Sequence, residues 1–341
     1  MTTGRRADLC ELSTVDTSFL LAGMLAAAEY FNQDSEAERE IRTLADALYR
    51  RVDWPWARAG GATVTHGWKP ESGFLPYRWE GYDEALILYV LALGSPTHPI
   101  PADSYAAWSR TYSWERFYGR ELLYAGPLFI HQYSHLWIDF RGIQDAFMRE
   151  KGIDYFENSR RATYAQRAYA IDNPAGFKDY GKDVWGLTAC IGPGGGKAHV
   201  AGREIHFHDY WARGASRGDV RDDGTIAPAA AAGSMPFAPE IVLPALGRMR
   251  AAYGGRLFQR YGFIDAFNPT FALTGLTSTT GPVYPEGWFA ANYLGIDQGP
   301  ILLMAENHRS GFVWDVMRQN EYVVRGLCRA GFTGGWMLNR C

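Results

Sequence analysis

The 341-residue chain lacks several features that would assign it to a class at once. It has no excess of basic residues, because 34 Lys and Arg stand against 37 Asp and Glu, a formal net charge of −3. Without a basic surface to neutralise phosphates, nucleic acid is not expected as a partner. The longest apolar run, residues 85–94, is about half of what a bilayer-spanning helix needs, so membrane insertion is not expected either.

Cysteine, linkers and a leader segment are also scarce. The four cysteines lie far apart without a C-x-x-C pair, which indicates neither a zinc cluster nor a dense disulfide framework. No Pro/Ser-rich linker and no block of like charges interrupts the chain, which favours a single domain over residues 1–341. The N-terminus lacks the apolar core of a signal peptide. As the chain stands this predicts a cytoplasmic location, with a periplasmic or secreted one as the alternative if an upstream segment is missing.

Aromatic residues, in contrast, are unusually common: 12 Trp, 20 Tyr and 18 Phe make up 15% of the chain. Sugar-binding clefts stack aromatic rings on the apolar faces of pyranose rings, and Tyr and Trp add hydrogen-bonding edges. An aromatic-rich core explains any single ring equally well. The composition therefore allows a carbohydrate site without identifying its rings.

Hydrophobic periodicity predicts an all-α fold of about ten helices with almost no strand. Residues 16–31 are apolar nearly all round, as is typical of an inner helix, with Asp16 or Thr17 as the N-cap. Residues 35–52 open with a capping box at Ser35 and predict an outer helix packed on the first. Its apolar stripe consists of Ile41, Leu44, Leu48 and Val52.

The rest of the chain continues the alternation of buried and amphipathic segments. Residues 62–82 predict a hairpin or extended loop, residues 181–223 predict a long glycine- and histidine-rich loop, and the other segments are helical or apolar. Those segments are 83–93, 104–117, 127–140, 142–170, 236–253 and 298–324, the last broken at Ser310 and Gly311. Such an alternation fits a toroid of helical hairpins with an inner and an outer ring.

Two carboxylates stand at the starts of inner-type helices, Asp16 and Glu84. Inner helices of a toroid run in one direction, so both residues are expected to face one cleft. Cleavage of a glycosidic bond needs such a pair, one acid to protonate the leaving oxygen and one carboxylate to activate water or attack the anomeric carbon. The alternative for Asp16 is a purely structural N-cap. For Glu84, burial would raise its pKa and the helix dipole would lower it.

The segment WEGYDE places Glu80 and Asp83 close to Glu84. Trp79 directly precedes Glu80, and Tyr82 directly precedes Asp83. Repulsion among close carboxylates can keep one proton bound near neutral pH, as a general acid requires. A solvated acidic turn at a helix start is the alternative. The aromatic neighbours predict sugar platforms.

His131, His135 and Asp139 recur at four-residue spacing, which on one helical face could hold a metal ion. No Glu follows the first His, so the zincin signature is missing, and hydrogen-bonded histidines in a cleft are the favoured interpretation. The segment HFHD, with His206, is a weaker candidate of the same kind. Neither a metal nor a cofactor is predicted, since acid-base cleavage of an acetal needs none.

Five motifs in order resemble the glucoamylase-like domain family, which includes bacterial endo-β-1,2-glucanases and a domain of cyclic β-1,2-glucan synthases. They span Ser13 to Trp314 and read STVDTSFLLAGMLAAAEYF, GWKPESGFLPYRWEGYDEALILYVLALGSPTHPI, GPLFIHQYSHLWIDFRG, DVWGLTAC and YLGIDQGPILLMAENHRSGFVW. The resemblance implies an (α/α)6 toroid and hydrolysis of glucan with inversion. An incomplete toroid is one alternative, because family members begin with additional helical sequence before the VDT motif.

The resemblance maps functional acids of the family onto Asp16 and Glu84. Asp16 stands where the family has glutamate, and Ser13 stands where the glucanases have a second acid. These two departures leave the substrate open to another glucosidic linkage, or to a binding protein that has lost catalysis. The expected substrate-binding residues are Trp79, Glu80, Tyr82, Asp83, His131, His135, Asp139, Arg141, Trp185, Trp288 and Asp297. The expected partner is a glucan or oligosaccharide, and the oligomeric state is left open.

Overall fold

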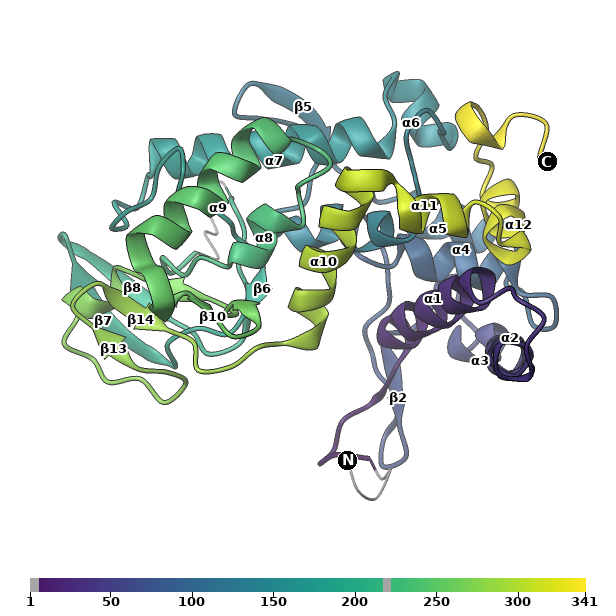
Figure 1. Ribbon diagram of the computed structural model, residues 1–341, viewed down its shortest axis with the longest axis horizontal. Coiled ribbons are helices and arrows are strands. Elements are labelled where there is room, and N and C mark those ends of the chain that lie inside the picture. The colour runs from purple at the N-terminus through teal and green to yellow at the C-terminus, as the bar shows by residue number, and fades with distance from the viewer. Residues whose placement is uncertain (1–5, 217–221) are drawn as a thin grey trace. The chain divides into compact units, whose positions relative to one another are not determined.

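The computed structural model describes residues 6–216 and 222–341 and divides into two compact units (Figure 1). Unit 1 contains residues up to 113 together with 137–155 and 312–341. Unit 2 contains residues 114–136 and 156–311. Each unit has a buried apolar interior of its own. The single domain expected from the sequence stays a prediction.

Unit 1 is helical, with one small sheet. Its antiparallel strands are β1 (Leu12–Ser13), β2 (Gly67–Lys69) and β3 (Gly73–Phe74), the last two forming the predicted hairpin. Its helices are α1 (Thr14–Tyr30), α2 (Glu36–Arg50), α3 (Trp54–Ala57), α4 (Leu86–Gly94), α5 (Asp103–Ser109), α6 (Ala146–Lys151), α11 (Phe312–Met317) and α12 (Glu321–Arg329).

Helix α1 begins two residues earlier than its sequence suggests. Ser13 is the N-cap, and its Oγ accepts a hydrogen bond from the Asp16 amide at 3.2 Å. The assignment of Asp16 or Thr17 as the cap is therefore wrong. Asp16 lies in the first turn of α1 with an exposed side chain, so N-capping does not explain the presence of this carboxylate.

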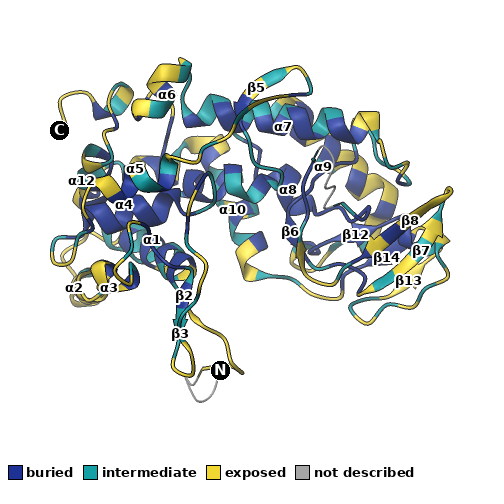
Figure 2. Ribbon diagram, turned by 180° about the vertical axis from the view of Figure 1, so that it is seen from behind, coloured by how far each residue is buried: buried dark blue, intermediate teal, exposed yellow. Residues whose placement is uncertain are grey.

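The centre of unit 1 is α4, in which every residue is buried, as its continuous apolar sequence predicts (Figure 2). It packs against α12 and α1. α4 and α12 approach each other closely at Gly326. A Cβ at this position would collide with the Val90 carbonyl oxygen, so the contact requires glycine. α4 thus forms a fixed floor behind the segment that contains Glu84.

Helix α2 confirms the predicted cap but not the predicted buried stripe. The Ser35 Oγ accepts from the Glu38 amide at 3.3 Å. The helix buries Ala45 and Tyr49, whereas Leu44 and Leu48 remain exposed (Figure 2). The stripe expected to face the first helix is therefore turned partly towards solvent.

Unit 2 combines helices with short antiparallel strands. Its helices are α7 (Tyr155–Asp172, whose first residue belongs to unit 1), α8 (Pro228–Ala232), α9 (Pro239–Tyr253) and α10 (Gly295–Ser310), with 3₁₀ turns at Leu128–His131 and Tyr133–Leu136. Its strands are β4 (Trp114–Phe117), β5 (Arg120–Leu123), β6 (Ala189–Cys190), β7 (Gly196–Val200), β8 (Arg203–Phe207), β9 (Trp211–Ala212), β10 (Phe258–Gln259), β11 (Gly262–Phe263), β12 (Phe267–Asn268), β13 (Val283–Tyr284) and β14 (Gly287–Phe289).

Strand content is the main correction to the all-α expectation. In the region predicted as a loop over 181–223, the described residues 181–216 and 222–223 contain four strands, among them the β7–β8 hairpin, and the other residues of the region lie outside the described part of the chain. The predicted helix over 104–117 ends at Ser109 and continues into β4, and the stretch 142–170 is divided between α6 and α7. The break predicted at Ser310 and Gly311 is confirmed, because α10 ends there with Gly311 in the left-handed conformation. The fold is helical in large part, with a strand-rich section in unit 2.

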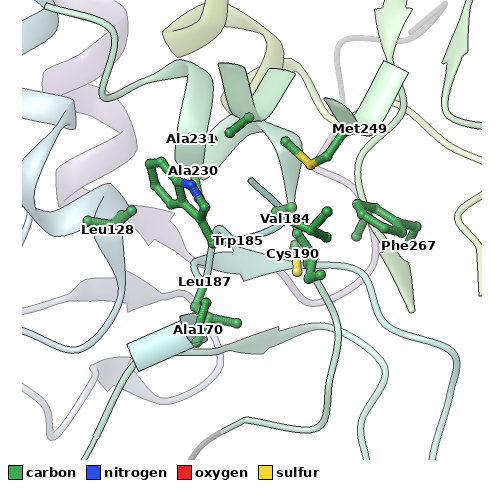
Figure 3. Close-up of a cluster of buried hydrophobic side chains, with 14 of the residues drawn as sticks. Leu128, Ala170, Val184, Trp185, Leu187, Cys190, Ala230, Ala231, Met249 and Phe267 are labelled. Carbon is green, nitrogen blue, oxygen red and sulfur yellow. The ribbon is translucent and has the colours of Figure 1, made fainter. Parts of the chain in front are cut away.

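The core of unit 2 collects apolar side chains from many of these elements (Figure 3). Trp185 lies among Leu128, Ala230 and Leu187, and Phe267 and Met249 lie towards the other end of the cluster.

No helix in the described part of the chain is long and apolar enough to cross a membrane.

Candidate active site

Glu84 lies in the turn that leads into α4, one residue before the N-cap Ala85. The turn is held by Asp83, whose Oδ1 accepts hydrogen bonds from the Ala85 amide and the Trp108 indole, both at 3.0 Å. The Gly81 amide also donates to the Trp108 carbonyl at 2.8 Å, and Gly81 has a φ of 89°, which only glycine adopts readily. Asp83 therefore positions the backbone from which Glu84 projects.

The Glu84 carboxyl is half-buried, and its environment favours the protonated form. Burial raises its pKa from 4.5 to about 7, a backbone hydrogen bond opposes the shift, and the negative charge of Asp16 adds to it. Burial and the charge of Glu84 also raise the pKa of Asp83. Glu84 thus keeps its proton to higher pH than an ordinary glutamate, a property that suits a general acid near neutral pH.

Asp16 and Glu84 are brought together, as the sequence predicts. α1 packs against α4, and the Asp16 charge acts on the Glu84 carboxyl. Asp16 is exposed to solvent and Glu84 is half-buried. The two carboxylates therefore have different environments, which is the arrangement that separates the roles of acid and base.

The aromatic residues of this segment differ in what they can contact. Trp79 is buried, stacks on His66 with 3.8 Å between ring centroids, and donates from its indole N–H to the Thr14 hydroxyl at 3.0 Å. This burial makes Trp79 a supporting residue and contradicts its expected role as an open sugar platform. Tyr82 is half-buried and packs edge-on against Tyr112 at 5.8 Å. Glu80 is exposed and accepts from Thr63 at 2.8 Å.

Asp139 and Arg141 form a second polar group in unit 1. The Asp139 carboxylate is buried and accepts from the Arg141 side chain at 2.7 and 2.8 Å, and Arg318 also pairs with it. Burial opposes ionisation of Asp139, but the hydrogen bonds and charges of the arginines hold its pKa below the ordinary value. The Arg141 guanidinium lies over Trp314 at 4.5 Å and remains half exposed. The exposed part of the Arg141 guanidinium can therefore contact a ligand. Asp139 pairs with Arg141 and Arg318 and has a positioning role.

The predicted histidine face does not exist, because residues 127–140 form two 3₁₀ turns and not one α-helix. His131 is buried beside the Ala125 carbonyl at 3.2 Å and Asn158 at 3.4 Å, and burial lowers its pKa to about 4. His135 bonds to the Ser159 hydroxyl at 3.1 Å. Throughout residues 6–216 and 222–341, no three His, Cys, Asp or Glu side chains are grouped closely enough to hold a metal ion.

Trp185 and Trp288 belong to the core of unit 2 and not to an open surface. Figure 3 shows Trp185 within this cluster. The exposed fractions of Trp185 and Trp288 are 1% and 0%. A ring without an accessible face cannot stack on a pyranose, so the prediction that both residues bind substrate is corrected to a packing role.

Asp297, a predicted site residue, is paired with Asp265, which the sequence analysis missed. Both are buried. The Ile191 amide donates to Asp265 Oδ2 at 2.7 Å, and the Tyr133 hydroxyl donates to Asp297 Oδ1 at 3.4 Å. Burial and the Asp265 charge raise the pKa of Asp297 to about 8, and burial also raises the pKa of Asp265.

The remaining oxygens explain why this pair keeps a proton. Asp265 Oδ1 and Asp297 Oδ2 are buried and have no hydrogen-bond donor among the described residues. Burial and the repulsion between two neighbouring carboxylates disfavour ionisation of both groups, so one of them keeps a proton and can supply the missing donor. A single aspartate in the apolar sequence GFIDAF was the only signal for Asp265, and sequence spacing did not connect it to Asp297.

Comparisons with known proteins identify the family to which the chain belongs. The Glycoamylase family model, described as "Putative glucoamylase", matches residues 76–321. The chain is 35% identical to a solved protein named a putative glucoamylase from Bacteroides fragilis, with a TM-score of 0.80 over 95% of this chain and 71% of that one. It is 33% identical to an endo-β-1,2-glucanase from Chitinophaga pinensis, solved with sophorotriose and glucose, with a TM-score of 0.80 over 95% of this chain and 72% of that one.

A curated relative is the exo β-1,2-glucooligosaccharide sophorohydrolase (non-reducing end) of Parabacteroides distasonis. It is 29% identical in an alignment that covers 92% of this chain and 42% of the relative. The chain therefore spans less than half the length of that protein.

Proposed function

Because the chain belongs to the Glycoamylase family, we propose that it is a glycoside hydrolase that cleaves β-1,2-linked glucan or its oligosaccharides. Two of its relatives are named for hydrolysis of this linkage, one as an endo-acting and one as an exo-acting enzyme. The proposal includes an (α/α)6 toroid as the fold, which the TM-score of 0.80 with the endo-β-1,2-glucanase supports. The observation that carries it is the half-buried Glu84 carboxyl, whose pKa lies near 7 beside a second carboxylate.

In the proposed mechanism Glu84 is the general acid. Its proton passes to the glycosidic oxygen as the bond to the anomeric carbon breaks, so the leaving sugar departs as an alcohol. Asp16 is the partner carboxylate, which takes a proton from the water that attacks the anomeric carbon from the opposite face. The product then has inverted configuration, and both carboxyls return to their starting states when solvent exchanges one proton. No cofactor takes part in this chemistry.

The other residues position the substrate or the acid. Asp83 fixes the turn before α4 and is a positioning residue. Tyr82 and Glu80 flank that turn with accessible atoms, and Arg141 has an exposed guanidinium. We propose that these three contact sugar hydroxyls.

The test is Glu84→Gln, which keeps size and hydrogen bonding but removes the transferable proton. Turnover of β-1,2-glucan should fall by roughly 10²–10⁴-fold while glucan affinity and melting temperature change little. The matched control is Glu150→Gln, at an exposed glutamate of α6, which should leave turnover unchanged. A folded Glu84→Gln enzyme with near-normal kcat would remove Glu84 from the mechanism.

The pH profile gives an independent readout of the same group. Because a general acid must be protonated, kcat/KM should fall as the pH rises through about 7. Asp16→Asn removes the negative charge that helps to raise the pKa of Glu84. In this variant Glu84 should therefore lose its proton at lower pH, and the alkaline limb of the residual activity should shift to lower pH. An unchanged alkaline limb in Asp16→Asn would show that Asp16 does not act on Glu84.

Substrate identity requires a panel of linkages. Sophorose and β-1,2-glucan should yield reducing sugar, whereas starch and β-1,3- or β-1,4-glucans should not. Activity on starch alone would overturn the β-1,2 assignment, and glucan binding without any turnover would favour a binding protein that has lost catalysis. Product length distinguishes endo from exo action.

A further inference from the structure

Residues 331–341, which follow α12 in unit 1, contact the part of the chain that carries Arg141. One contact is an antiparallel bridge between Gln144 and Thr333. The amide of each residue donates to the carbonyl of the other, at 2.9 and 3.0 Å. The Arg149 guanidinium spans this bridge, since it donates to the Gln144 carbonyl at 2.6 Å and to the Thr333 hydroxyl at 3.1 Å. Backbone and side-chain hydrogen bonds thus fix how the two segments align close to Arg141.

Two glycines of the same segment lie against the backbone of Arg141 and Gly142. A Cβ at Gly335 would lie 2.9 Å from the Gly142 carbonyl and 3.1 Å from the Arg141 carbonyl oxygen. A Cβ at Gly334 would lie 2.8 Å from the Gly142 carbonyl oxygen. Gly334 and Gly335 also have φ of 86° and 46°, a region in which other residues are strained. The close approach of the two backbones therefore requires glycine at both positions.

Trp336 links the segment to the residue that holds the Arg141 side chain. Its indole N–H donates to the Asp139 carbonyl at 2.7 Å. The Asp139 carboxylate accepts from the Arg141 guanidinium at 2.7 and 2.8 Å and from the Arg141 amide at 3.0 Å. A two-armed contact of this kind fixes the plane of a guanidinium. The orientation of Arg141 therefore depends on Asp139, whose backbone is held by Trp336.

Two more arginines connect the Trp336 ring to the same carboxylate. Arg318 pairs with Asp139, and its guanidinium lies over the Trp336 ring at 5.7 Å from the centroid. Arg340 lies over that ring at 5.5 Å and donates to the Arg318 carbonyl at 2.6 Å. The ring therefore packs between groups that also orient Asp139.

A disulfide closes the segment. It joins Cys341 to Cys328, which lies in α12. A closed loop has less conformational freedom than the same residues without the cross-link. Because α12 packs against the buried helix α4, the disulfide anchors the loop to the core of unit 1.

We propose that residues 331–341 form a positioning loop for Arg141, in which Trp336 and the disulfide hold the guanidinium in place for a sugar hydroxyl. A side chain binds a ligand more tightly when its neighbours fix its rotamer in advance. The Arg141 side chain is half exposed and would otherwise lose rotamer freedom on binding. Trp336 is a positioning residue that acts through Asp139. The inference rests on the proposed role of Arg141 as a sugar contact.

Hydrogen exchange tests the positioning loop without reference to activity. Trp336→Phe keeps an aromatic ring but removes the indole N–H, so amides of residues 139–144 should exchange about two- to tenfold faster. Cys328→Ser and reduction of the wild-type disulfide should have the same direction of effect. Trp56→Phe, at a 42% exposed tryptophan of α3, is the matched control and should leave this region unchanged. Unchanged exchange in Trp336→Phe or in Cys328→Ser would overturn the proposal.

Steady-state kinetics on β-1,2-glucan test whether the loop acts through Arg141. Arg141→Ala should raise KM by at least about tenfold at a similar kcat, because it removes a charged contact to the bound sugar. Trp336→Phe should raise KM by about two- to tenfold, also at a similar kcat. In the Arg141→Ala background, Trp336→Phe should have no further effect on KM. A tryptophan that only stabilised the fold would act equally in both backgrounds. Circular dichroism establishes that each variant is folded.

The outcomes separate this inference from the proposed function. An unchanged KM in Trp336→Phe, or a KM effect that persists at full size in the Arg141→Ala background, would overturn the positioning role and leave glucan hydrolysis standing. A wild-type protein that hydrolyses no glucan would refute the proposed function. An unchanged KM in Arg141→Ala would refute the sugar contact and the functional part of this inference with it. In both of those cases the exchange rates still decide whether residues 331–341 hold the Arg141 segment.

Discussion

Asp265 and Asp297 show how burial and hydrogen bonding set the ionisation of a pair of side chains. Each has one fixed donor from the protein, the Ile191 amide for Asp265 and the Tyr133 hydroxyl for Asp297. The buried Asp265 Oδ1 and Asp297 Oδ2 have no donor in the described part of the chain, and burial together with the repulsion between the two groups keeps one proton on the pair. Folding therefore takes up a proton that the unfolded chain would release above its ordinary carboxyl pKa near 4.

This uptake predicts a pH dependence of stability. A carboxyl whose pKa is raised in the folded state stabilises the fold least at high pH, so the wild-type melting temperature should fall as the pH rises from about 4 to about 8. Asp297→Asn supplies a permanent amide donor to Asp265 and should flatten that fall. Calorimetry at a series of pH values measures the difference.

The control for this prediction is Asp209→Asn, at an exposed aspartate of unit 2. It should leave the pH dependence of the wild type unchanged. A wild type and an Asp297→Asn variant with parallel melting curves from pH 4 to pH 8 would contradict a shared proton.

At the residue scale, the sequence predicted that Asp16 and Glu84 lie near each other, whereas it did not predict which aromatic rings are buried. Glu84 could be proposed because it precedes an apolar helix, but the opposing effects of burial and helix dipole could not be weighed. The structure decides for burial, since Glu84 lies outside α4 and is half-buried. The burial of Trp185 and Trp288 could not be foreseen, because stacking on sugar and packing in a core favour the same residue type.

The elements divide in the same way into those with strong local signals and those without. The buried helix α4 and the amphipathic α2 were predictable from periodicity. The β7–β8 hairpin was missed although its sequence holds a two-residue turn, Ala201 and Gly202, with φ of 50° and 79°. Glycine and histidine around it suggested a loop, and β7 and β8 are each only five residues long.

The N-terminus of α1 yields a prediction about the capping role of Ser13. Ser13→Ala removes the acceptor for the Asp16 amide and should lower the free energy of unfolding by about 1 kcal/mol. Ser13→Asp keeps an N-cap acceptor and should retain most of the wild-type stability. Denaturant unfolding of the three proteins provides the measurement. Equal losses in both variants would mean that the Ser13 hydroxyl acts through other contacts.

At the scale of the whole molecule, the chain passes between the two units four times, after Ser113, Leu136, Tyr155 and Gly311. Neither unit is a continuous segment. Unfolding of one unit therefore releases the ends of segments that belong to the other unit. The single domain expected from the sequence stays a prediction, for which cooperative unfolding is the physical test. A disulfide joining Cys328 to Cys341 closes a loop within unit 1, a bond that the cysteine spacing did not predict.

The disulfide allows that test. In the chain-entropy model, closing a loop of 13 residues restricts the unfolded chain by about 3 kcal/mol, so Cys328→Ser should lower the melting temperature by several degrees. If the chain is one domain, calorimetry should show a single transition that shifts as a whole. A reducing agent should move the wild type to the same position and leave the variant where it is. Two transitions, of which Cys328→Ser lowers only one, would instead mean that unit 1 and unit 2 unfold independently, because a cross-link confined to unit 1 cannot stabilise a separately folding neighbour.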